Sequence, residues 1–243
     1  MSKININIIE SKIFELLFNY YLKRNIKKDY IPNNYKYFST PVEIQNWATK
    51  YFEYFKTLEK IEFEERMQQA ISLNPPERIF LIEDLYKWYA GNFFRNINAL
   101  LRGAYPYNNV DYVNKKAQIL EQEINKFQLE DNVIVIRRIS NKFLESYLLK
   151  DKKLTKGVVF SDKAFLSTSM YLYYRNYTEG SYKPLKYESL LIIKVPKKTN
   201  AIYLEPISNR EEYELLLPKN LTIVVEKKIK IFSNYIIFSI LKI

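Results

Sequence analysis

Hydrophobic positions recur at helical spacing in the first half of the chain. One stripe has apolar residues three or four positions apart, which are Ile44, Trp47, Ala48, Tyr51 and Phe55. A second stripe runs from about residue 82 to residue 101, and Gly103 follows where such a helix would end. A further helix is expected over residues 109–127. The first half of the chain is therefore predicted to be mainly helical.

After about residue 130 the pattern changes to short runs of β-branched and other apolar residues, which are typical of strands. The runs are Val133–Ile139, Leu190–Val195, Ala201–Leu204, Tyr213–Leu217, Leu221–Val225 and Tyr235–Leu241. Helices followed by a series of strands indicate an α+β fold rather than alternating helices and strands. Residues 1–40 have the least clear pattern, and we expect them to form a helical extension.

Composition restricts the chemistry that the chain can perform. The 243 residues include no Cys and no His, which excludes thiol nucleophiles, zinc–thiolate sites and a Ser-His-Asp triad. Only four residues are Gly, which argues against a glycine-rich phosphate loop. Catalysis must therefore use carboxylates, hydroxyls, Arg, Lys or Tyr, and we expect no metal.

The formal charge of +11 invites a nucleic-acid interpretation, but the lysines are scattered. We interpret most of them as a solvated face, suited to acidic partners or an anionic membrane surface, and predict no specific nucleic-acid site. No apolar run is long enough to span a bilayer, so no transmembrane segment is expected. The apolar stretch at residues 13–19 is interrupted by Glu15 and Asn19, and it does not read as a signal peptide.

Three short segments carry candidate chemistry. Arg137 and Arg138 end an apolar run, Ser167-Thr168-Ser169 offers three short hydroxyls, and Glu212 and Glu214 flank a tyrosine. Taken alone, the first segment is more simply interpreted as a strand edge with solvated charges, and the second as a polar turn at the end of a strand. The third divides evenly between a solvated acidic turn and a functional pair. In a strand, Glu212 and Glu214 would project to the same face, at the mouth of a strand that looks buried on both faces.

In this order, the arginine pair, Ser-Thr-Ser and Glu-x-Glu resemble the Arg-Ser-Glu class of mono-ADP-ribosyltransferase toxins, a clostridial and bacillary family of actin- or Rho-modifying exoenzymes. Residues 85–103 resemble the family's helix with its Tyr-x-Gly, Ile-Asn and Leu-Arg signature, and residues 44–47 resemble its opening helix. The resemblance covers roughly residues 40 to 243. It implies N-terminal helices followed by a two-sheet mixed β core, with residues 41–243 as the catalytic domain and residues 1–40 as an extension.

The resemblance also implies cleavage of the bond between nicotinamide and ribose in NAD, which is a substrate here. Glu214 would stabilise the oxocarbenium-like ribose, Ser167 would orient Glu214, and Arg137 would clamp a phosphate. The other expected NAD contacts are Asn98, Arg102, Arg138, Thr168 and Arg175. Tyr89 either packs near the nicotinamide or belongs to the core, and the second reading is slightly favoured.

By the same resemblance, Glu212 selects the acceptor, because family members with Glu there usually modify arginine. Members with Gln modify asparagine or act on Rho proteins. We therefore expect transfer to an arginine of a host protein, with actin favoured and a Rho-type GTPase second. An NAD glycohydrolase and an inactive binding module of the same fold are the alternatives. Residues 206–211 lack the aromatic residue that often precedes the acidic pair, which leaves the target open.

The family resemblance implies a secreted or injected protein that acts in the host cytosol. Binary toxins use a second copy of the domain to dock a translocation partner, and this chain has none. A single-domain exoenzyme, an injected effector and a phage-encoded modifier all fit the sequence, and a separate translocation partner is a further expectation.

Overall fold

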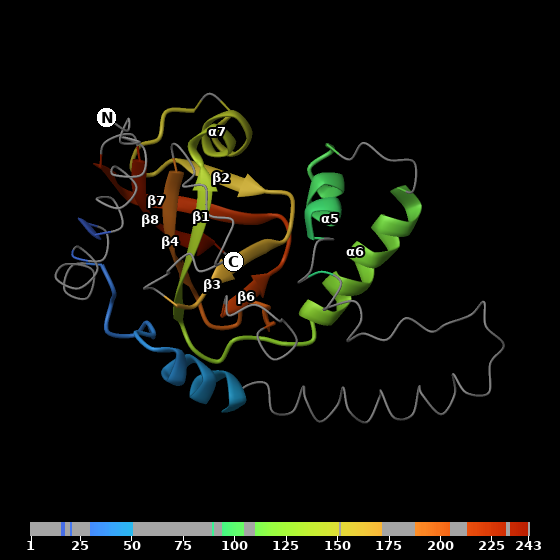
Figure 1. The fold of residues 1–243 in the computed structure, drawn as a ribbon, viewed down its shortest axis with the longest axis horizontal. Coiled ribbons are helices and arrows are strands. Elements are labelled where there is room, and N and C mark those ends of the chain that lie inside the picture. Colours follow the sequence, from blue (N-terminus) through green and yellow to red (C-terminus); the bar gives the residue numbers. More distant parts are fainter. Residues whose placement is uncertain are drawn as a thin grey trace, which may run out of the picture.

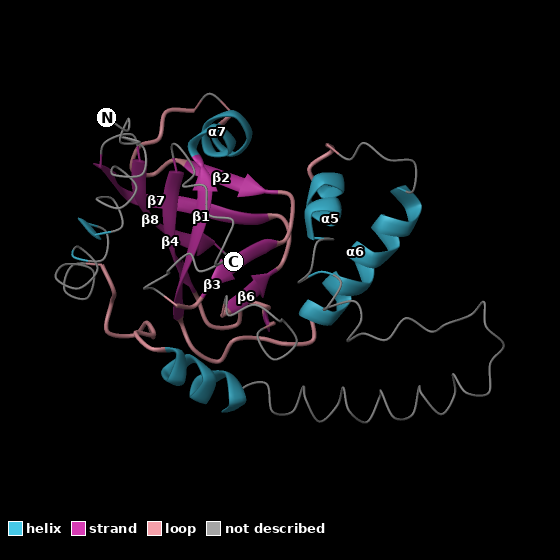
Figure 2. Ribbon diagram, viewed as in Figure 1, coloured by secondary structure: helices cyan, strands magenta, loops and turns pink. Residues whose placement is uncertain are grey.

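The computed structural model describes residues 16–17, 20, 30–50, 89, 94–104, 110–150, 152–171, 188–204, 213–231 and 234–242. Within these ranges, helices cluster early in the chain and strands dominate after residue 132 (Figure 1). The strands gather in the middle of the molecule and the helices lie at its periphery (Figure 2). The α+β prediction is confirmed.

The helices lie close to where the apolar stripes predict them. Residues 41–50 are helical, and α5 (Phe94–Leu101) and α6 (Val110–Ile124) follow. A short α7 (Asn141–Phe143) continues directly into a π-helix, η3 (Leu144–Leu149), which the sequence pattern did not predict. Tyr51, Phe55 and most of the expected helix before α5 lie outside the described residues.

The strands match the predicted runs with two additions. They are β1 (Val133–Ser140), β2 (Val159–Asp162), β3 (Leu166–Ser169), β4 (Glu188–Val195), β5 (Ile202–Tyr203), β6 (Glu214–Leu217), β7 (Leu221–Ile231) and β8 (Asn234–Lys242). All six predicted runs correspond to strands, although β7 is longer than expected. β2 and β3 are too short and too polar to stand out by composition.

All eight of these strands belong to one sheet, in the order β2-β7-β8-β4-β1-β3-β6-β5. β4 and β8 run parallel, and the other neighbours are antiparallel. β1 and β3 are joined through one paired position, Ile136 with Ser169, and this pairing links the two halves of the sheet. The expected two-sheet core is not confirmed, because the described strands are hydrogen-bonded into a single sheet.

β1 is covered on both faces. Val133, Val135 and Ile139 enter the larger core, whereas Ile134 and Ile136 enter a smaller core on the opposite face. Since successive side chains of a strand alternate between faces, an unbroken apolar run indicates this double burial.

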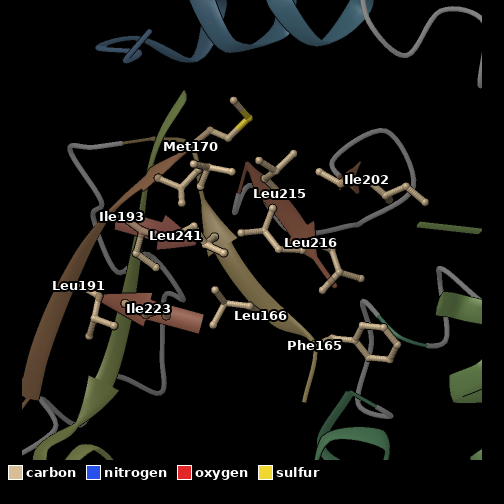
Figure 3. Close-up of a cluster of buried hydrophobic side chains, with 14 of the residues drawn as sticks. Phe165, Leu166, Met170, Leu191, Ile193, Ile202, Leu215, Leu216, Ile223 and Leu241 are labelled. Carbon is tan, nitrogen blue, oxygen red and sulfur yellow. The ribbon is translucent and has the colours of Figure 1, made fainter. Parts of the chain in front are cut away.

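The larger core joins the two halves of the sheet. Figure 3 shows Leu166 and Leu215 from one half in the same cluster as Leu191 and Ile193 from the other. Each such buried side chain contributes about 1.5–3 kcal/mol relative to an exposed one. This core therefore holds β3 and β6 in a fixed position beside β1.

An irregular segment, residues 30–38, covers the smaller core. The ring of Tyr30 stacks on Phe238 with centroids 4.1 Å apart. The backbone N–H of Lys36 donates to the Asn132 carbonyl (2.8 Å), and its carbonyl accepts from the N–H of Ile134 (2.9 Å). Lys36 therefore pairs backbone groups at the start of β1, where β3 does not reach. Residues 30–39 contain no helix, whereas residues 16–17 and 20 are helical. The helical extension and the domain boundary at residue 40 stay predictions.

The helix of residues 41–50 begins with a capping box. Thr40 Oγ1 accepts from the N–H of Glu43 (3.2 Å), and the Glu43 carboxylate accepts from the N–H of Ser39 (2.8 Å). Pro41 occupies the first helical position, where its missing N–H removes no intrahelical bond. The helix then buries the described part of the predicted stripe, which is Ile44, Trp47 and Ala48.

We expect Thr40→Ala to lower the free energy of unfolding by about 1 kcal/mol, because the N–H of Glu43 loses its acceptor. Urea denaturation followed by circular dichroism measures this change. Thr40→Ser retains the hydroxyl and should stay near the wild type, and an equal loss in both variants would contradict the capping role.

Candidate active site

A cavity of about 560 Å³ lies among α5, β1, β3 and the start of β6, a volume typical of small-molecule sites. Its walls are formed by Tyr89, Phe94, Arg95, Asn98, Ala99, Arg102, Ala104, Ile136, Arg137, Arg138, Ser167, Thr168, Ser169 and Glu214. Of the predicted site residues, Arg175 and Glu212 lie outside the described residues. All of the others line this cavity, so the fold brings together residues that are more than 100 positions apart in the sequence.

The end of α5 places Asn98 and Arg102 at the cavity. Gly103 adopts a φ of 77°, which confirms it as the predicted helix end. The N–H groups of Gly103 and Ala104 return to carbonyls of the last turn at 2.9 and 2.8 Å, in a Schellman motif. Since Asn98 and Arg102 are four positions apart, they share one side of the helix end.

Arg102 is held by a carboxylate at the end of β2. Its Nε donates to Asp162 Oδ1 (3.0 Å) and its Nη2 donates to Asp162 Oδ2 (2.7 Å). The Asp162 side chain is 3% exposed and also accepts the N–H of Ala164 at 3.0 Å. Such a bidentate, buried pair has a well-defined geometry, so the direction of the Arg102 guanidinium is fixed.

The side chain of Arg137, a residue of β1, lies next to this pair. Its Nη2 lies 3.6 Å from Asp162 Oδ2, and its Nη1 donates to the Ser167 carbonyl at 3.5 Å. Burial lowers the pKa of the Arg137 guanidinium, and the negative charge of Asp162 opposes part of this shift. Arg137 therefore remains a cation in the cavity wall and requires nearby negative groups.

The pairing of β3 with β6 determines which hydroxyl lies beside Glu214. Ser169 is directly opposite Glu214, whereas Ser167 is opposite Leu216 and lies one diagonal step away on the same face. Thr168 faces the other way, and its hydroxyl donates to the Leu215 carbonyl at 2.6 Å. Ser169 is therefore an additional candidate for contact with Glu214, and Thr168 fastens β3 to β6.

The strand that carries Glu214 starts at Glu214 itself. Tyr213 precedes it with a φ of 49°, a left-handed conformation that is uncommon for a bulky residue. Its carbonyl accepts the N–H of Met170 at 3.0 Å, and its ring packs edge-on against Tyr171. The expectation of one extended strand through both acidic residues is wrong at Tyr213. The buried character of β6 on both faces is confirmed.

Tyr89 and Asn98 form a buried part of the cavity wall. Tyr89 is 1% exposed, and its hydroxyl accepts from Asn98 Nδ2 at 3.3 Å. Burial, followed by the negative charge of Glu214, raises the pKa of the Tyr89 hydroxyl, so it stays a neutral phenol. Asn98 Oδ1 is buried and has no hydrogen-bond partner among the described residues. Tyr89 belongs to the core as expected, and it also faces the cavity.

A sequence profile described as ADP-ribosyltransferase exoenzyme matches residues 81–236, which is more than half of the 243-residue chain. The chain belongs to the ADP-ribosyltransferase exoenzyme family. The resemblance found in the motifs is therefore confirmed, and the family's reaction is ADP-ribosyl transfer with NAD as substrate. The matched span includes every residue that lines the cavity.

Solved structures share the fold of this exoenzyme. The Clostridium limosum C3 exoenzyme is 20% identical over 87% of this chain and 98% of its own, with a TM-score of 0.58. C3stau2 from S. aureus, solved with NAD, is 16% identical over 86% of this chain and 99% of its own, with a TM-score of 0.58. The ADP-ribosyltransferase Vis, solved with agmatine, is 13% identical over 86% of this chain and 88% of its own, with a TM-score of 0.53.

No curated protein sequence matches the chain. Within the described ranges, none of the helices has the length and apolar character needed to cross a membrane. The same ranges hold no group of three or more acidic side chains arranged to bind a metal ion.

Two charged residues at the candidate site, Arg95 and Asp162, were missed by the sequence reasoning. Arg95 lines the cavity beside Phe94, with its guanidinium 5.6 Å from the ring centroid. Asp162 does not line the cavity, but its carboxylate accepts hydrogen bonds from Arg102 and lies 3.6 Å from Arg137 Nη2. The need for a counter-charge beside two predicted arginines is a signal for such a residue, but no sequence spacing identifies Asp162 as the one that supplies it.

We expect Tyr89→Phe to weaken the alkaline loss of stability. In the unfolded chain a tyrosine ionises near its ordinary pKa of 10.0, whereas the folded-state pKa of Tyr89 is higher. The folded state then binds more protons above about pH 10, so this stabilisation is complete below pH 10 and is lost as pH rises. The wild type should lose up to about 1.4 kcal/mol more per pH unit than the variant.

Urea denaturation at several pH values from 9 to 11 measures the two slopes. Tyr112→Phe, at an exposed position, is the control for loss of a tyrosine. Identical slopes for the wild type and Tyr89→Phe would contradict the assignment.

Proposed function

We propose that the chain cleaves the nicotinamide–ribose bond of NAD and transfers ADP-ribose to an arginine of a host protein. The observation that carries this proposal is the convergence of Arg137, Ser167 and Glu214 on one cavity. Family membership supplies the class of reaction, and these three residues are the ones that the motif resemblance relates to it. Their presence argues against an inactive binding module.

In this proposal Glu214 stabilises the ribose as the bond to nicotinamide breaks. The bond breaks through an oxocarbenium-like state, which carries positive charge on the sugar. Glu214 is 6% exposed and lines the cavity. Water is largely excluded around it, so its negative charge acts on the ribose with little screening. Ser167 and Ser169, on the same face of the neighbouring strand, would orient its carboxylate.

Arginines would bind the pyrophosphate. Arg95, Arg102, Arg137 and Arg138 all line the cavity, and planar guanidinium groups match phosphate oxygens in pairs. Thr168 and Arg175 remain proposed contacts of the same ligand. Asn98 Oδ1 is a buried acceptor that a donor of NAD, such as a ribose hydroxyl or the carboxamide, would satisfy. No step of this scheme uses a metal.

The acceptor proposal rests on Glu212. A carboxylate there would bind a guanidinium and help it to become a nucleophile. The likeness to Vis supports an arginine acceptor, because agmatine also carries a guanidinium group. Actin is the favoured target and a Rho-type GTPase is the second candidate. The enzyme would be secreted or injected and act in the host cytosol, with a separate translocation partner where it is not injected.

We expect Glu214→Gln to reduce NAD cleavage at least about 100-fold, because the neutral amide no longer stabilises the oxocarbenium charge. Release of nicotinamide from labelled NAD measures this rate. Glu130→Gln, at an exposed position, should cleave NAD at the wild-type rate. Cleavage by Glu214→Gln at more than a tenth of that rate would contradict the role.

We expect Glu212→Gln to suppress arginine labelling while leaving part of the NAD hydrolysis, since an amide does not pair with a guanidinium charge. The assay incubates the enzyme with labelled NAD and a cell lysate, then with purified actin and a Rho-type GTPase. Mass spectrometry of the labelled band identifies the residue. Free ADP-ribose without any labelled protein would favour the glycohydrolase alternative, and equal arginine labelling by the variant would exclude Glu212 as the selecting residue.

A further inference from the structure

Asp162 lies at the end of β2 as a carboxylate with an unusual number of partners. Its two oxygens accept three hydrogen bonds, two from Arg102 and one from the N–H of Ala164, at 2.7 to 3.0 Å. Arg137 approaches the same Oδ2 to 3.6 Å. A buried charge is costly unless it is paired and hydrogen-bonded, and here one carboxylate serves two guanidinium groups.

The carboxylate stands behind the cavity wall. Arg102 and Arg137 both line the cavity, whereas Asp162 does not. Because the Nε–Nη2 edge of Arg102 faces Asp162, the Nη1 donors of this planar group point away from it. Asp162 therefore acts on a ligand through the arginines rather than by contact.

Aromatic rings fix the flat face of the same guanidinium. The Arg102 guanidinium carbon lies 4.8 Å from the ring centroid of Phe143 and 5.8 Å from that of Tyr147. The two rings are stacked with centroids 5.1 Å apart. The π-helix η3 places Tyr147 in this position. Arg102 is thus held at one edge by charge and on one face by packing, which leaves it little rotational freedom.

The positive charges of Arg102 and Arg137 explain why a carboxylate is needed beside them. Burial lowers the pKa of the Arg137 guanidinium most, the negative charge of Asp162 opposes this shift, and the positive charge of Arg102 lowers the pKa further. Without the carboxylate, two buried guanidinium groups would repel each other. With Asp162 present, one carboxylate lies beside both guanidinium groups, and both arginines line the same cavity.

We propose that Asp162 is a positioning residue that holds Arg102 and Arg137 as a preorganised pair for the pyrophosphate of NAD. This inference rests on the proposed function, because it takes the cavity to be the NAD site. It makes a prediction opposite to that of simple charge balance. Removing a negative charge near a dianion should strengthen binding by electrostatics alone, whereas loss of positioning should weaken it.

The test compares Asp162→Asn with the wild type and with Glu226→Gln. Glu226 pairs with Lys194 at 2.9 Å and lies outside the cavity wall, so its variant changes net charge equally. Isothermal titration calorimetry measures binding of NAD and of ADP-ribose, which carries the pyrophosphate but has no bond to cleave. Nicotinamide release gives KM and kcat. Circular dichroism confirms that each variant is folded.

We expect Asp162→Asn to weaken NAD and ADP-ribose binding about tenfold and to raise KM by a similar factor, because small displacements of binding groups are costly. The effect on kcat should be smaller, and Glu226→Gln should bind as the wild type does. A purely structural role would lower the unfolding temperature without moving KM. Unchanged or tighter binding by folded Asp162→Asn would overturn the inference.

Should Asp162→Asn fail to fold, Asp162→Glu retains the charge and moves the carboxylate by one methylene. Weaker ADP-ribose binding by this variant supports positioning, and wild-type binding overturns it. The two proposals can fail separately. A wild type that binds ADP-ribose but does not cleave NAD would exclude the proposed function alone, and one that binds neither ligand would exclude both.

Discussion

The pairing of β1 with β3 is the contact on which the site depends. Ile136 of β1 and Ser169 of β3 are opposite each other, and this is the one paired position between the two halves of the sheet. Bridges from Lys36 to Val133 and from Phe38 to Tyr171, the bond from Arg137 to the Ser167 carbonyl and side-chain packing also hold the two halves together. Arg137 follows Ile136 directly, and Ser169 is opposite Glu214. The same contact therefore sets the distance between the cationic wall of the cavity and its acidic end. The large core, which includes Leu166 and Leu191, holds this pairing in place.

The second constraint is the balance of buried charge. Arg137 is mostly buried, and burial disfavours its charged form. Asp162 and Glu214 both act on it as negative charges, from behind the wall and from the cavity respectively. Four arginines and one glutamate line the described cavity, so it keeps a net positive charge. Its arginines come from the region of α5 and from β1, whereas Glu214 comes from β6. A ligand with a negative pyrophosphate and a sugar that becomes positive during reaction matches that separation.

The sequence predicted the parts of the molecule that depend on local pattern. The apolar runs of β1 and β8, the stripe of the helix at residues 41–50 and the helix end at Gly103 all follow from spacing and backbone preference. The residues that the motifs singled out, apart from Arg175 and Glu212, line one cavity. Asp162 was missed because its partners come from distant segments and only the tertiary fold makes them neighbours. The single sheet was missed because one β1–β3 pair, invisible in composition, decides between one sheet and two.

The error at Tyr213 has a physical consequence for the acidic pair. The argument that Glu212 and Glu214 share a face needs extended backbone through Tyr213, and this residue is left-handed. Such a conformation costs on the order of 1–3 kcal/mol unless its surroundings hold it, and here Met170 and Tyr171 do so. The regular geometry of β6 therefore begins only at Glu214, directly after the left-handed Tyr213. The carboxylate proposed for NAD cleavage is placed by the sheet, through the pairing of Glu214 with Ser169.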